Sequence, residues 1–359
     1  RSGVVFTESS QHQLSRSGRI VPICEHWLMP PSWNLVADIG GTNARFAVLM
    51  TGETENLFEF QYTVQQQPVF LSLIETLRER IISTTGWHHP PSNACFAVAC
   101  PANLDPVSIT NCPWHFTRHA LQSALKCESV TIINDFAAMA HGVHAITETD
   151  VIQIGGGKAQ QGKPVAVLGA GTGLGMAALI PNSCNYQIIE TEGGHADFAP
   201  LGDLQVRIEK YLQKEFGRVS LERLLSGPGL INIYQALVEG RDDKQRFTEP
   251  AQIVNAALNG KDKNALQVLD LFSAILGATA GNLALTYGAQ GGVYIAGGVI
   301  PRFEQLFVVS HFRQRFEDKG RFRNYLSNIP TFLVTKNNLG LFGASMCLHK
   351  KGNKQCKIC

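Results

Sequence analysis

Apolar residues are concentrated in short runs, most of which end at glycine, proline or an asparagine–aspartate pair. Runs of this length with such boundaries predict buried β-strands. The predicted strands are Leu35–Asp38, Phe46–Met50, Ala94–Cys100, Val130–Ile133, Val165–Leu168, Met176–Ile180 and Gly291–Ala296. A glycine-rich turn separates the first and second of these runs, and another separates Val165–Leu168 from Met176–Ile180. Each pair is therefore predicted to form a hairpin.

Longer segments between the strands carry apolar residues at helical spacing. The predicted helices are Phe70–Ile82, Phe136–Val143, Leu204–Phe216, Leu221–Leu225, Ala265–Tyr287 and Gly340–Leu348. We expect the short helix over Leu221–Leu225 to stop at Ser226-Gly227-Pro228-Gly229. Strands and helices alternate from end to end, which predicts an α/β fold with mixed sheets. No repeat with a period of 20–50 residues is evident.

The length of the chain, 359 residues, exceeds what one core usually spans, so we expect two lobes with a ligand cleft between them. Residues 1–33 are expected to be a disordered extension. A small α/β domain is expected over 34–145 plus 336–349, a large one over 146–335, and a tail over 350–359.

Composition fits a globular enzyme, with 44% apolar and 17% charged residues. The net charge of +2 gives no argument for nucleic acid or an anionic membrane as a partner. No uninterrupted apolar run reaches the roughly 18 residues of a membrane span. Of the nine cysteines, Cys95, Cys100 and Cys347 lie in apolar segments, whereas Cys356 and Cys359 form a C-x-x-C motif without a second pair. We expect a reduced, cytoplasmic protein.

Two glycine-rich turns are candidate phosphate-binding loops, because glycine lets backbone N–H groups approach a phosphate. The first contains Asp38, Gly40, Gly41, Thr42 and Asn43, and Asp38 could hold Mg²⁺ through water. The second is Gly169–Gly175, which contains Gly171, Thr172 and Gly173 but lacks the spacing of the dinucleotide fingerprint. Taken alone, each segment also fits an ordinary β-turn.

A third glycine segment, Gly157–Lys163, has the G-x₄-G-K spacing of a P-loop. Pro164 stands where a P-loop needs serine or threonine, and a strand rather than a helix follows. We interpret it as a polar loop with Lys163 in solvent.

Several polar residues near strand ends are candidate catalytic or sugar-binding groups. Asn134-Asp135 follows a strand, so Asp135 could accept a proton from an attacking hydroxyl, or could instead cap the next helix. Glu192 and His195 flank a glycine pair and suit sugar hydroxyls; zinc bound by His195 and Asp197 is the alternative. Glu222 alone fits a surface residue near a helix start. Gly297 and Gly298 could let an adenosine approach, or could serve close packing.

Together these segments resemble the bacterial-type glucokinase family of actin-like sugar kinases, over about Leu35 to Leu348. The resemblance is carried by LVADIGGTNARFAV, ACP, TNCPW, IINDFAAMAHG, LGAGTGLG, EGGHADFAP, SLERLLSGPGL, GGVYIAGGVIPRF and FEDKGRF, in this order. The related ROK branch carries a cysteine-rich zinc motif after Gly-Gly-His, where this chain reads Ala196 to Pro200. The resemblance implies a two-lobed actin-like (ribonuclease H-like) ATPase fold with an interdomain cleft.

The resemblance also implies roles for individual residues. It places Asn111, Asn134, Asp135, Glu192, His195 and Glu222 on glucose, with Asp135 as the base. It assigns Asp38, Gly40, Gly41, Thr42 and Asn43 to the first phosphate loop, Gly171, Thr172 and Gly173 to the second, and Gly297 and Gly298 to the adenosine.

The implied reaction transfers the γ-phosphoryl group of ATP to the 6-hydroxyl of D-glucose, with Mg²⁺ as cofactor. We expect a homodimer that binds glucose and ATP, with no nucleic acid or membrane partner. Two other functions stay open. A nucleotide-dependent binding protein of the same fold would hydrolyse ATP without sugar, and a sugar sensor would bind sugar without phosphoryl transfer.

Overall fold

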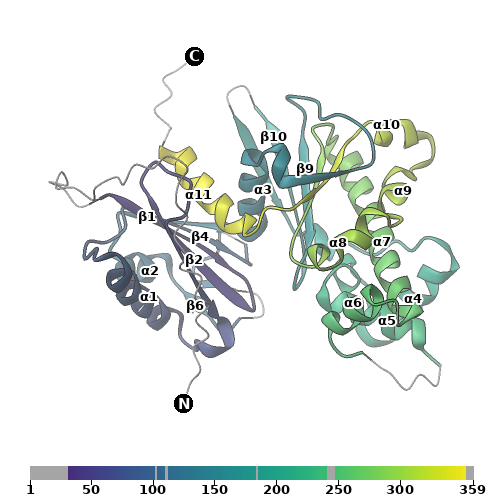
Figure 1. The fold of residues 1–359 in the computed structure, drawn as a ribbon, viewed down its shortest axis with the longest axis horizontal. Helices are drawn as coiled ribbons and strands as arrows, with labels where there is room; N and C mark the ends of the chain where they lie inside the picture. Colours follow the sequence, from purple (N-terminus) through teal and green to yellow (C-terminus); the bar gives the residue numbers. More distant parts are fainter. Residues whose placement is uncertain (1–30, 102, 110–111, 183–184, 241–246, 353–359) are drawn as a thin grey trace, which may run out of the picture. The chain divides into compact units, whose positions relative to one another are not determined.

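The computed structural model describes residues 31–101, 103–109, 112–182, 185–240 and 247–352. Several predictions fall outside these residues: the extension before residue 31, Asn111, and the tail with Cys356 and Cys359. Strand β1 already begins at Trp33, within the segment that was expected to be disordered. The described strands form two large sheets and one small one (Figure 1).

The first large sheet has five strands in the order β3-β2-β1-β4-β7. Its strands are β1 (Trp33–Ile39), β2 (Asn43–Met50), β3 (Phe58–Thr63), β4 (Asn93–Val98) and β7 (Ser129–Asn134). Strands β1 and β2 are antiparallel and joined by the turn of Gly40 and Gly41, whereas β4 and β7 run parallel to β1. A two-stranded sheet, β5 (Val107–Ser108) with β6 (His115–Phe116), lies between β4 and β7 in sequence.

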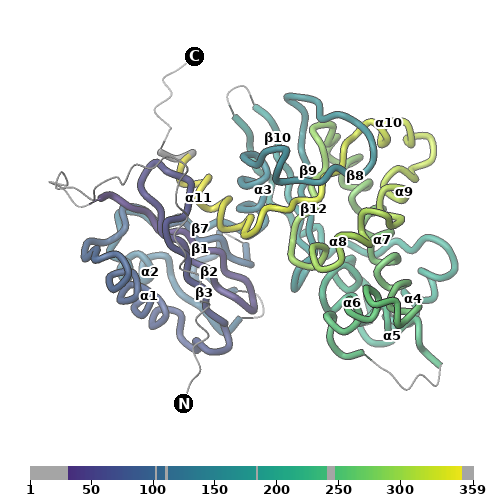
Figure 2. The backbone as a smooth tube through the Cα atoms, in the orientation of Figure 1, coloured from purple at the N-terminus to yellow at the C-terminus, as the bar shows by residue number. Residues whose placement is uncertain are grey.

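Helices cover both faces of this sheet. On one face, α1 (Phe70–Thr85) and α2 (Arg118–Leu125) pack into a core that contains Phe46, Phe96 and Trp114. On the other face, α3 (Asp135–Ala145) and α11 (Leu339–Gly352) pack through small residues against Val36 and Cys95. Figure 2 shows how the C-terminal helix α11, in yellow, returns to the strands at the start of the chain.

The second large sheet has six strands in the order β11-β10-β9-β12-β13-β8. Its strands are β8 (Val151–Ile154), β9 (Val165–Ala170), β10 (Leu174–Pro181), β11 (Tyr186–Thr191), β12 (Val293–Ala296) and β13 (Thr331–Val334). It repeats the pattern of the first sheet: an antiparallel meander, β9 to β11, is followed by parallel strands, β12 and β13.

The largest core of the protein lies between this sheet and a group of helices. The longer helices are α4 (Gly202–Phe216), α5 (Gly227–Val238), α6 (Pro250–Leu258) and α7 (Lys263–Tyr287). The shorter helices are α8 (Glu304–Val308), α9 (Phe312–Glu317) and α10 (Arg323–Ser327). The 3₁₀ turns are η1 (Val64–Gln66), η2 (Glu148–Asp150), η3 (Gly193–His195), η4 (Leu221–Arg223), η5 (Ile300–Phe303) and η6 (Gly320–Phe322). Helix α3 packs against the opposite face, through Phe136 and Val143.

All the predicted strands form, and so do the predicted helices except Leu221–Leu225, which is shortened to the 3₁₀ turn η4. The prediction that Ser226 to Gly229 stops a helix is wrong, because helix α5 begins there. The Ser226 hydroxyl accepts a hydrogen bond from Gly229 N at 3.0 Å, and Pro228 lies in the first turn. Serine at the N-cap and proline in the first turn both favour a helix start.

Helix α7 is longer and more apolar than the sequence suggested, since no uninterrupted apolar run reaches the length of a membrane span. By length and composition α7 could cross one, with a mean hydropathy of 1.6 over its most apolar window. Of that window, 67% is buried inside the protein. The apolar composition of α7 can therefore be explained by its place in the core.

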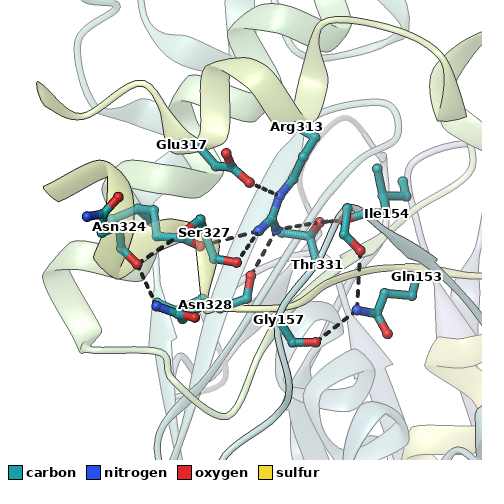
Figure 3. Close-up of polar contacts among 12 residues, drawn as sticks. Gln153, Ile154, Gly157, Arg313, Glu317, Asn324, Ser327, Asn328 and Thr331 are labelled. Carbon is teal, nitrogen blue, oxygen red and sulfur yellow. Dashed lines mark hydrogen bonds and ion pairs between the residues drawn. The ribbon is translucent and has the colours of Figure 1, made fainter.

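One largely buried arginine, Arg313, connects helix α9 to the second sheet (Figure 3). Arg313, on α9, donates hydrogen bonds to Ile329 O at 2.8 Å and Ser327 O at 3.0 Å. It also donates to Glu317 Oε1 at 2.6 Å and Thr331 Oγ1 at 3.3 Å. The side chain is 13% exposed. Arg313 thus joins α9 to the segment that leads into β13.

Candidate active site

The predicted site residues meet at a cavity of about 340 Å³ that is lined by both large sheets. From the first sheet come the turn after β1 and the end of β7, and from the second come the turn after β9 and the end of β12. The carboxyl ends of parallel strands lie at one edge of a sheet, where such folds bind ligands. Of the predicted site residues, only Asn111 is not among those that line it, because it lies outside the described residues.

Asp38 lies near the end of β1 and faces Arg45 across the hairpin. The two residues are direct partners in the antiparallel register, and Arg45 Nη1 lies 3.9 Å from Asp38 Oδ2. The Asp38 carboxylate also packs against the first turn of α11, where a Cβ at Gly340 would come within 2.9 Å of it. Burial raises the pKa of Asp38, and the positive charge of Arg45 partly opposes that rise.

Asn134 and Asp135 lie where β7 passes directly into α3. The Asn134 side chain caps the helix: its Oδ1 accepts from Phe136 N at 2.9 Å and from Ala137 N at 3.3 Å. The alternative that Asp135 is the cap is therefore wrong, since Asp135 is the first residue of the helix. Asn134 Nδ2 donates to Cys100 O at 3.3 Å. This pair of contacts fixes the backbone on which Asp135 stands.

The Asp135 carboxylate has one oxygen engaged by the protein, since Oδ1 accepts from Phe136 N at 2.9 Å. Burial first, and then the negative charge of Asp38, raise the pKa of Asp135 to about 7. Such a carboxylate is about half ionised at neutral pH, and its ionised form is basic enough to accept a proton. Burial and the charge of Asp135 also raise the pKa of the nearby Cys100 thiol to about 11.

The second glycine turn is held by Glu222. Glu222 Oε2 accepts a hydrogen bond from Leu174 N at 3.0 Å, directly after Gly173. Gly171 O accepts from Gly227 N at 2.8 Å, at the start of α5. Glu222 lies in the first turn of η4, as a residue near a helix start, but its side chain braces the glycine turn and also lines the cavity.

Gly297 follows β12 beside the same turn, with φ of +90°. A Cβ there would lie 2.4 Å from Ala170 O, so only glycine fits.

Glu192 and His195 project from the loop after β11. Their side chains are 64% and 56% exposed, and Glu192 Oε2 lies 3.9 Å from His195 Nε2. The loop is held by Arg218, which donates to His195 O at 3.0 Å and pairs with the Asp197 carboxylate. That pairing occupies Asp197, the second ligand of the zinc alternative. Among the residues that the structure describes, no three histidine, cysteine, aspartate or glutamate side chains cluster as a metal site would require.

Arg45 is the functional candidate that the sequence analysis missed. Among the described residues that line the cavity, four are carboxylates, Asp38, Asp135, Glu192 and Glu222, and Arg45 is the only lysine or arginine. A polyphosphate bound there would need a positive charge. The signal was present in the sequence, because Arg45 lies two residues after Asn43 in a predicted hairpin and so points to the same face.

Comparison with solved structures defines the class of protein. A glucokinase from an Antarctic psychrotroph has a TM-score of 0.76 and 34% sequence identity, covering 89% of this chain and 99% of its own. A glucokinase from Balamuthia mandrillaris in complex with glucose, 22% identical, has a TM-score of 0.76 and covers 89% and 94%, which supports the fold alone. The chain has the actin-like α/β fold of sugar kinases, with mixed sheets.

Sequence comparison gives the family. The Glucokinase family profile matches residues 35–351. A glucokinase from Tolumonas auensis is 42% identical over 317 residues, which cover 88% of this chain and 97% of that relative. The chain therefore belongs to the glucokinase family. Its predicted activity, that of an ATP-dependent hexose kinase, is confirmed.

Proposed function

We propose that the cavity between the two glycine turns transfers the γ-phosphoryl group of ATP to the 6-hydroxyl of D-glucose, with Asp135 as the base. The observation that carries this assignment is a carboxylate with a pKa near 7, fixed at a strand–helix junction in a cavity lined by both turns. Asp135 Oδ2 would orient the sugar hydroxyl and take its proton as the oxygen attacks phosphorus. Phosphoryl transfer has a loose transition state, so orientation matters more than the strength of the base.

The backbone of the turns of Gly40-Gly41 and Gly171-Gly173 would hold the phosphate oxygens of ATP, with Thr42, Asn43 and Thr172 as side-chain donors. Gly297 and Gly298 would leave space for the adenosine. Arg45 would offset the charge of the polyphosphate.

Asp38 fits Mg²⁺ bound with ATP. Mg²⁺ usually retains water and takes one or two carboxylates together with substrate phosphates, so a dedicated cage of protein ligands is not needed. Asp38 is a buried carboxylate beside the first turn, with Asp135 as its acidic neighbour. Bound Mg²⁺ would neutralise phosphate charge. It would also favour the ionised form of Asp38, which burial disfavours.

Glucose would lie on the Asn134, Glu192, His195 and Glu222 side of the cavity, and Asn111 stays a predicted contact. Glu192 and His195 are still exposed, which leaves their polar atoms available to sugar hydroxyls. The Asn134 side chain is already engaged in capping α3, so we expect its share in sugar binding to be smaller than that of Glu192.

The first experiment is a coupled phosphorylation assay with ATP and Mg²⁺ across glucose, mannose, fructose, N-acetylglucosamine and no sugar. Turnover with glucose well above that with the other sugars supports the proposal. Sugar-independent ATP hydrolysis would indicate a nucleotide-dependent binding protein instead. Glucose binding without product would indicate a sensor.

Replacement of Glu192 by glutamine should weaken glucose binding, because a charged hydrogen-bond acceptor is lost at a sugar hydroxyl. We expect the KM for glucose to rise about tenfold or more, with a smaller change in kcat. Initial-rate kinetics at saturating ATP measure this. Glu239→Gln is a control, since Glu239 pairs with Lys214 outside the cavity. An unchanged glucose dependence of Glu192→Gln would remove Glu192 from the sugar site.

Replacement of Arg45 by alanine should mainly affect ATP, because the cavity loses its only lysine or arginine. We expect kcat/KM for ATP to fall about tenfold or more, with the affinity for glucose little changed. Arg45→Lys should recover part of the loss, since it restores charge without the planar fork. Initial-rate kinetics with ATP and glucose varied separately measure the effect on each substrate. An equal loss for both substrates would indicate a structural role.

The remaining assignments are a homodimer, a cytoplasmic location, and the division of the chain into a small domain over 34–145 plus 336–349 and a large domain over 146–335. The separate cores of the two large sheets support that division. Size-exclusion chromatography with light scattering tests the dimer.

A further inference from the structure

A second cavity, of about 380 Å³, shares no lining residue with the active-site cavity. It lies at the other end of the same elements. Helix α3 begins with Asp135 at the active site and ends with Val143 and His144 at the second cavity. Strand β10 likewise begins at Leu174 in the first cavity and ends at Pro181 in the second. The proposed kinase function makes no use of this second cavity.

Residues 159–163, the C-terminal part of the G-x₄-G-K segment that was interpreted as a polar loop, line one side of the second cavity. The segment connects β8 to β9 and has no helix after it, so it is not a P-loop. Two backbone hydrogen bonds hold it in place, from Gln160 N to Gln290 O at 3.0 Å and from Gly291 N to Pro164 O at 2.9 Å. The segment is therefore held at two places to the residues that precede β12.

Aromatic and apolar side chains form the floor of the cavity. Val143 and Leu179 are buried and belong to the core between α3 and the second sheet. The His144 and Tyr186 rings lie with their centroids 3.9 Å apart, and Tyr186 is held by a 2.9 Å contact between its hydroxyl and His141 Nδ1. Tyr294 lines the same space. Flat apolar surfaces of this kind favour an aromatic ring as occupant.

Among the described residues that line this cavity, Lys163 is the only lysine or arginine, and there is no aspartate or glutamate. Within the described parts of the chain, Lys163 makes no ion pair with any carboxylate. An exposed ammonium without a protein counter-ion, at the mouth of an apolar cavity, favours an anionic group on the ligand.

We propose that this second cavity is a binding site for a small aromatic anion, one ring bearing a phosphate or carboxylate group. The ring would lie against His144, Tyr186 and Tyr294, and the anionic group would bind Lys163. The volume suits a ligand of this size. This inference does not rest on the proposed kinase reaction.

Calorimetric titration of the full chain with phenyl phosphate tests the proposal, with saturating glucose and a non-hydrolysable ATP analogue present to block the active site. We expect binding with a Kd of about 1 mM or below. Benzylamine, which has the ring but the opposite charge, should bind at least about tenfold more weakly, and so should inorganic phosphate, which lacks the ring.

Variants identify the site. Lys163→Ala and His144→Ala should each weaken phenyl phosphate binding, Lys163→Ala by about tenfold. Lys158→Ala is the matched control, because Lys158 belongs to the same loop but lines a different cavity. No heat of binding at about 10 mM phenyl phosphate would overturn the proposal. So would equal affinity in Lys163→Ala, or an equal loss in Lys158→Ala.

Discussion

Replacement of Asp135 by asparagine should leave a folded protein whose turnover falls by about 10²-fold or more. Asparagine has nearly the same shape, and its amide oxygen can still accept the hydrogen bond that Phe136 N donates to Asp135 Oδ1. What it cannot do is take a proton from the sugar hydroxyl. The loss should therefore appear in kcat, measured by the coupled assay at saturating glucose and ATP.

The pH dependence gives an independent test of the same assignment. The base must be ionised, and the pKa of Asp135 is raised to about 7. The rate of the wild-type enzyme should therefore fall about tenfold per pH unit below pH 7 and level off above it. In Asp135→Asn the residual rate should lose this acidic limb. If the rate of Asp135→Asn still falls at acidic pH as in the wild type, the titrating group is a residue other than Asp135.

At pH 8 the replacement of Asp135 by asparagine should raise the stability of the folded protein, although it lowers the activity. Burial and Asp38 raise the pKa of Asp135 in the folded state above its usual 3.8. The stability that this group contributes is therefore fully present below pH 3.8 and is lost as pH rises through about 7. Asparagine stays neutral, so at pH 8 the variant should be more stable than wild type, by on the order of 1–3 kcal/mol. The difference should shrink towards pH 5, and urea unfolding at both pH values measures it. A variant that is both inactive and less stable at pH 8 would point to misfolding.

The parts of the fold that could be predicted are those with local signals. Buried strands β1, β4 and β9 are continuous apolar runs, and the two hairpins have glycine turns, so one window of sequence is enough for each. The strands that were missed are β3, β5, β6, β8, β11 and β13. Of these, β3, β8 and β11 lie at sheet edges and mix polar and apolar residues, so their sequences resemble loops. The repeated meander was missed too, because it is a repeat of hydrogen-bonding order and not of sequence.

The residues of the candidate site also divide into those that a local sequence signal identifies and those that only the folded structure reveals. Asp135, Asp38 and the glycine turns could be identified because each lies at a strand end, where chemistry is expected. The hydrogen bond from Leu174 N to Glu222 could not be predicted, because the two residues are 48 positions apart in sequence and meet only through tertiary packing. Asn134 shows a different limit: Asp135 was the residue considered as the cap, and only the backbone geometry shows that its neighbour Asn134 caps the helix.

The largest expected effect on stability concerns Arg313, which lies outside the active site (Figure 3). Its guanidinium donates to the carbonyls of Leu326, Ser327 and Ile329, while Glu317 supplies the compensating charge at 2.6 Å. The ring of Phe316 lies 4.9 Å from the guanidinium carbon. Alanine would remove this donor from all three carbonyls, of which Leu326 O would still accept from Ile329 N at 3.0 Å. It would also leave Glu317, with 23% of its side chain exposed, without its cation.

We expect Arg313→Ala to lower the free energy of unfolding by about 3–5 kcal/mol, since removal of one partner of a largely buried pair leaves the other uncompensated. Arg313→Lys should lose less, because the charge near Glu317 is kept while the fork to the carbonyls is lost. Urea or thermal unfolding, followed by circular dichroism, measures both. Because Arg313 is not among the residues that line the active-site cavity, the folded fraction should keep its kcat.

Arg315 provides a matched control two residues away on the same helix. It pairs with Asp318 at 3.1 Å, but the side chains are 36% and 43% exposed. An exposed pair of this kind contributes about 0–1 kcal/mol, so Arg315→Ala should change stability little. Because both arginines lie on one short helix, a larger loss of stability in Arg313→Ala than in Arg315→Ala can be attributed to the burial of Arg313 and to its hydrogen bonds with carbonyl groups. If Arg313→Ala costs no more than Arg315→Ala, β13 does not depend on this arginine, and the packing of α9 through Phe312 and Phe316 must hold the segment instead.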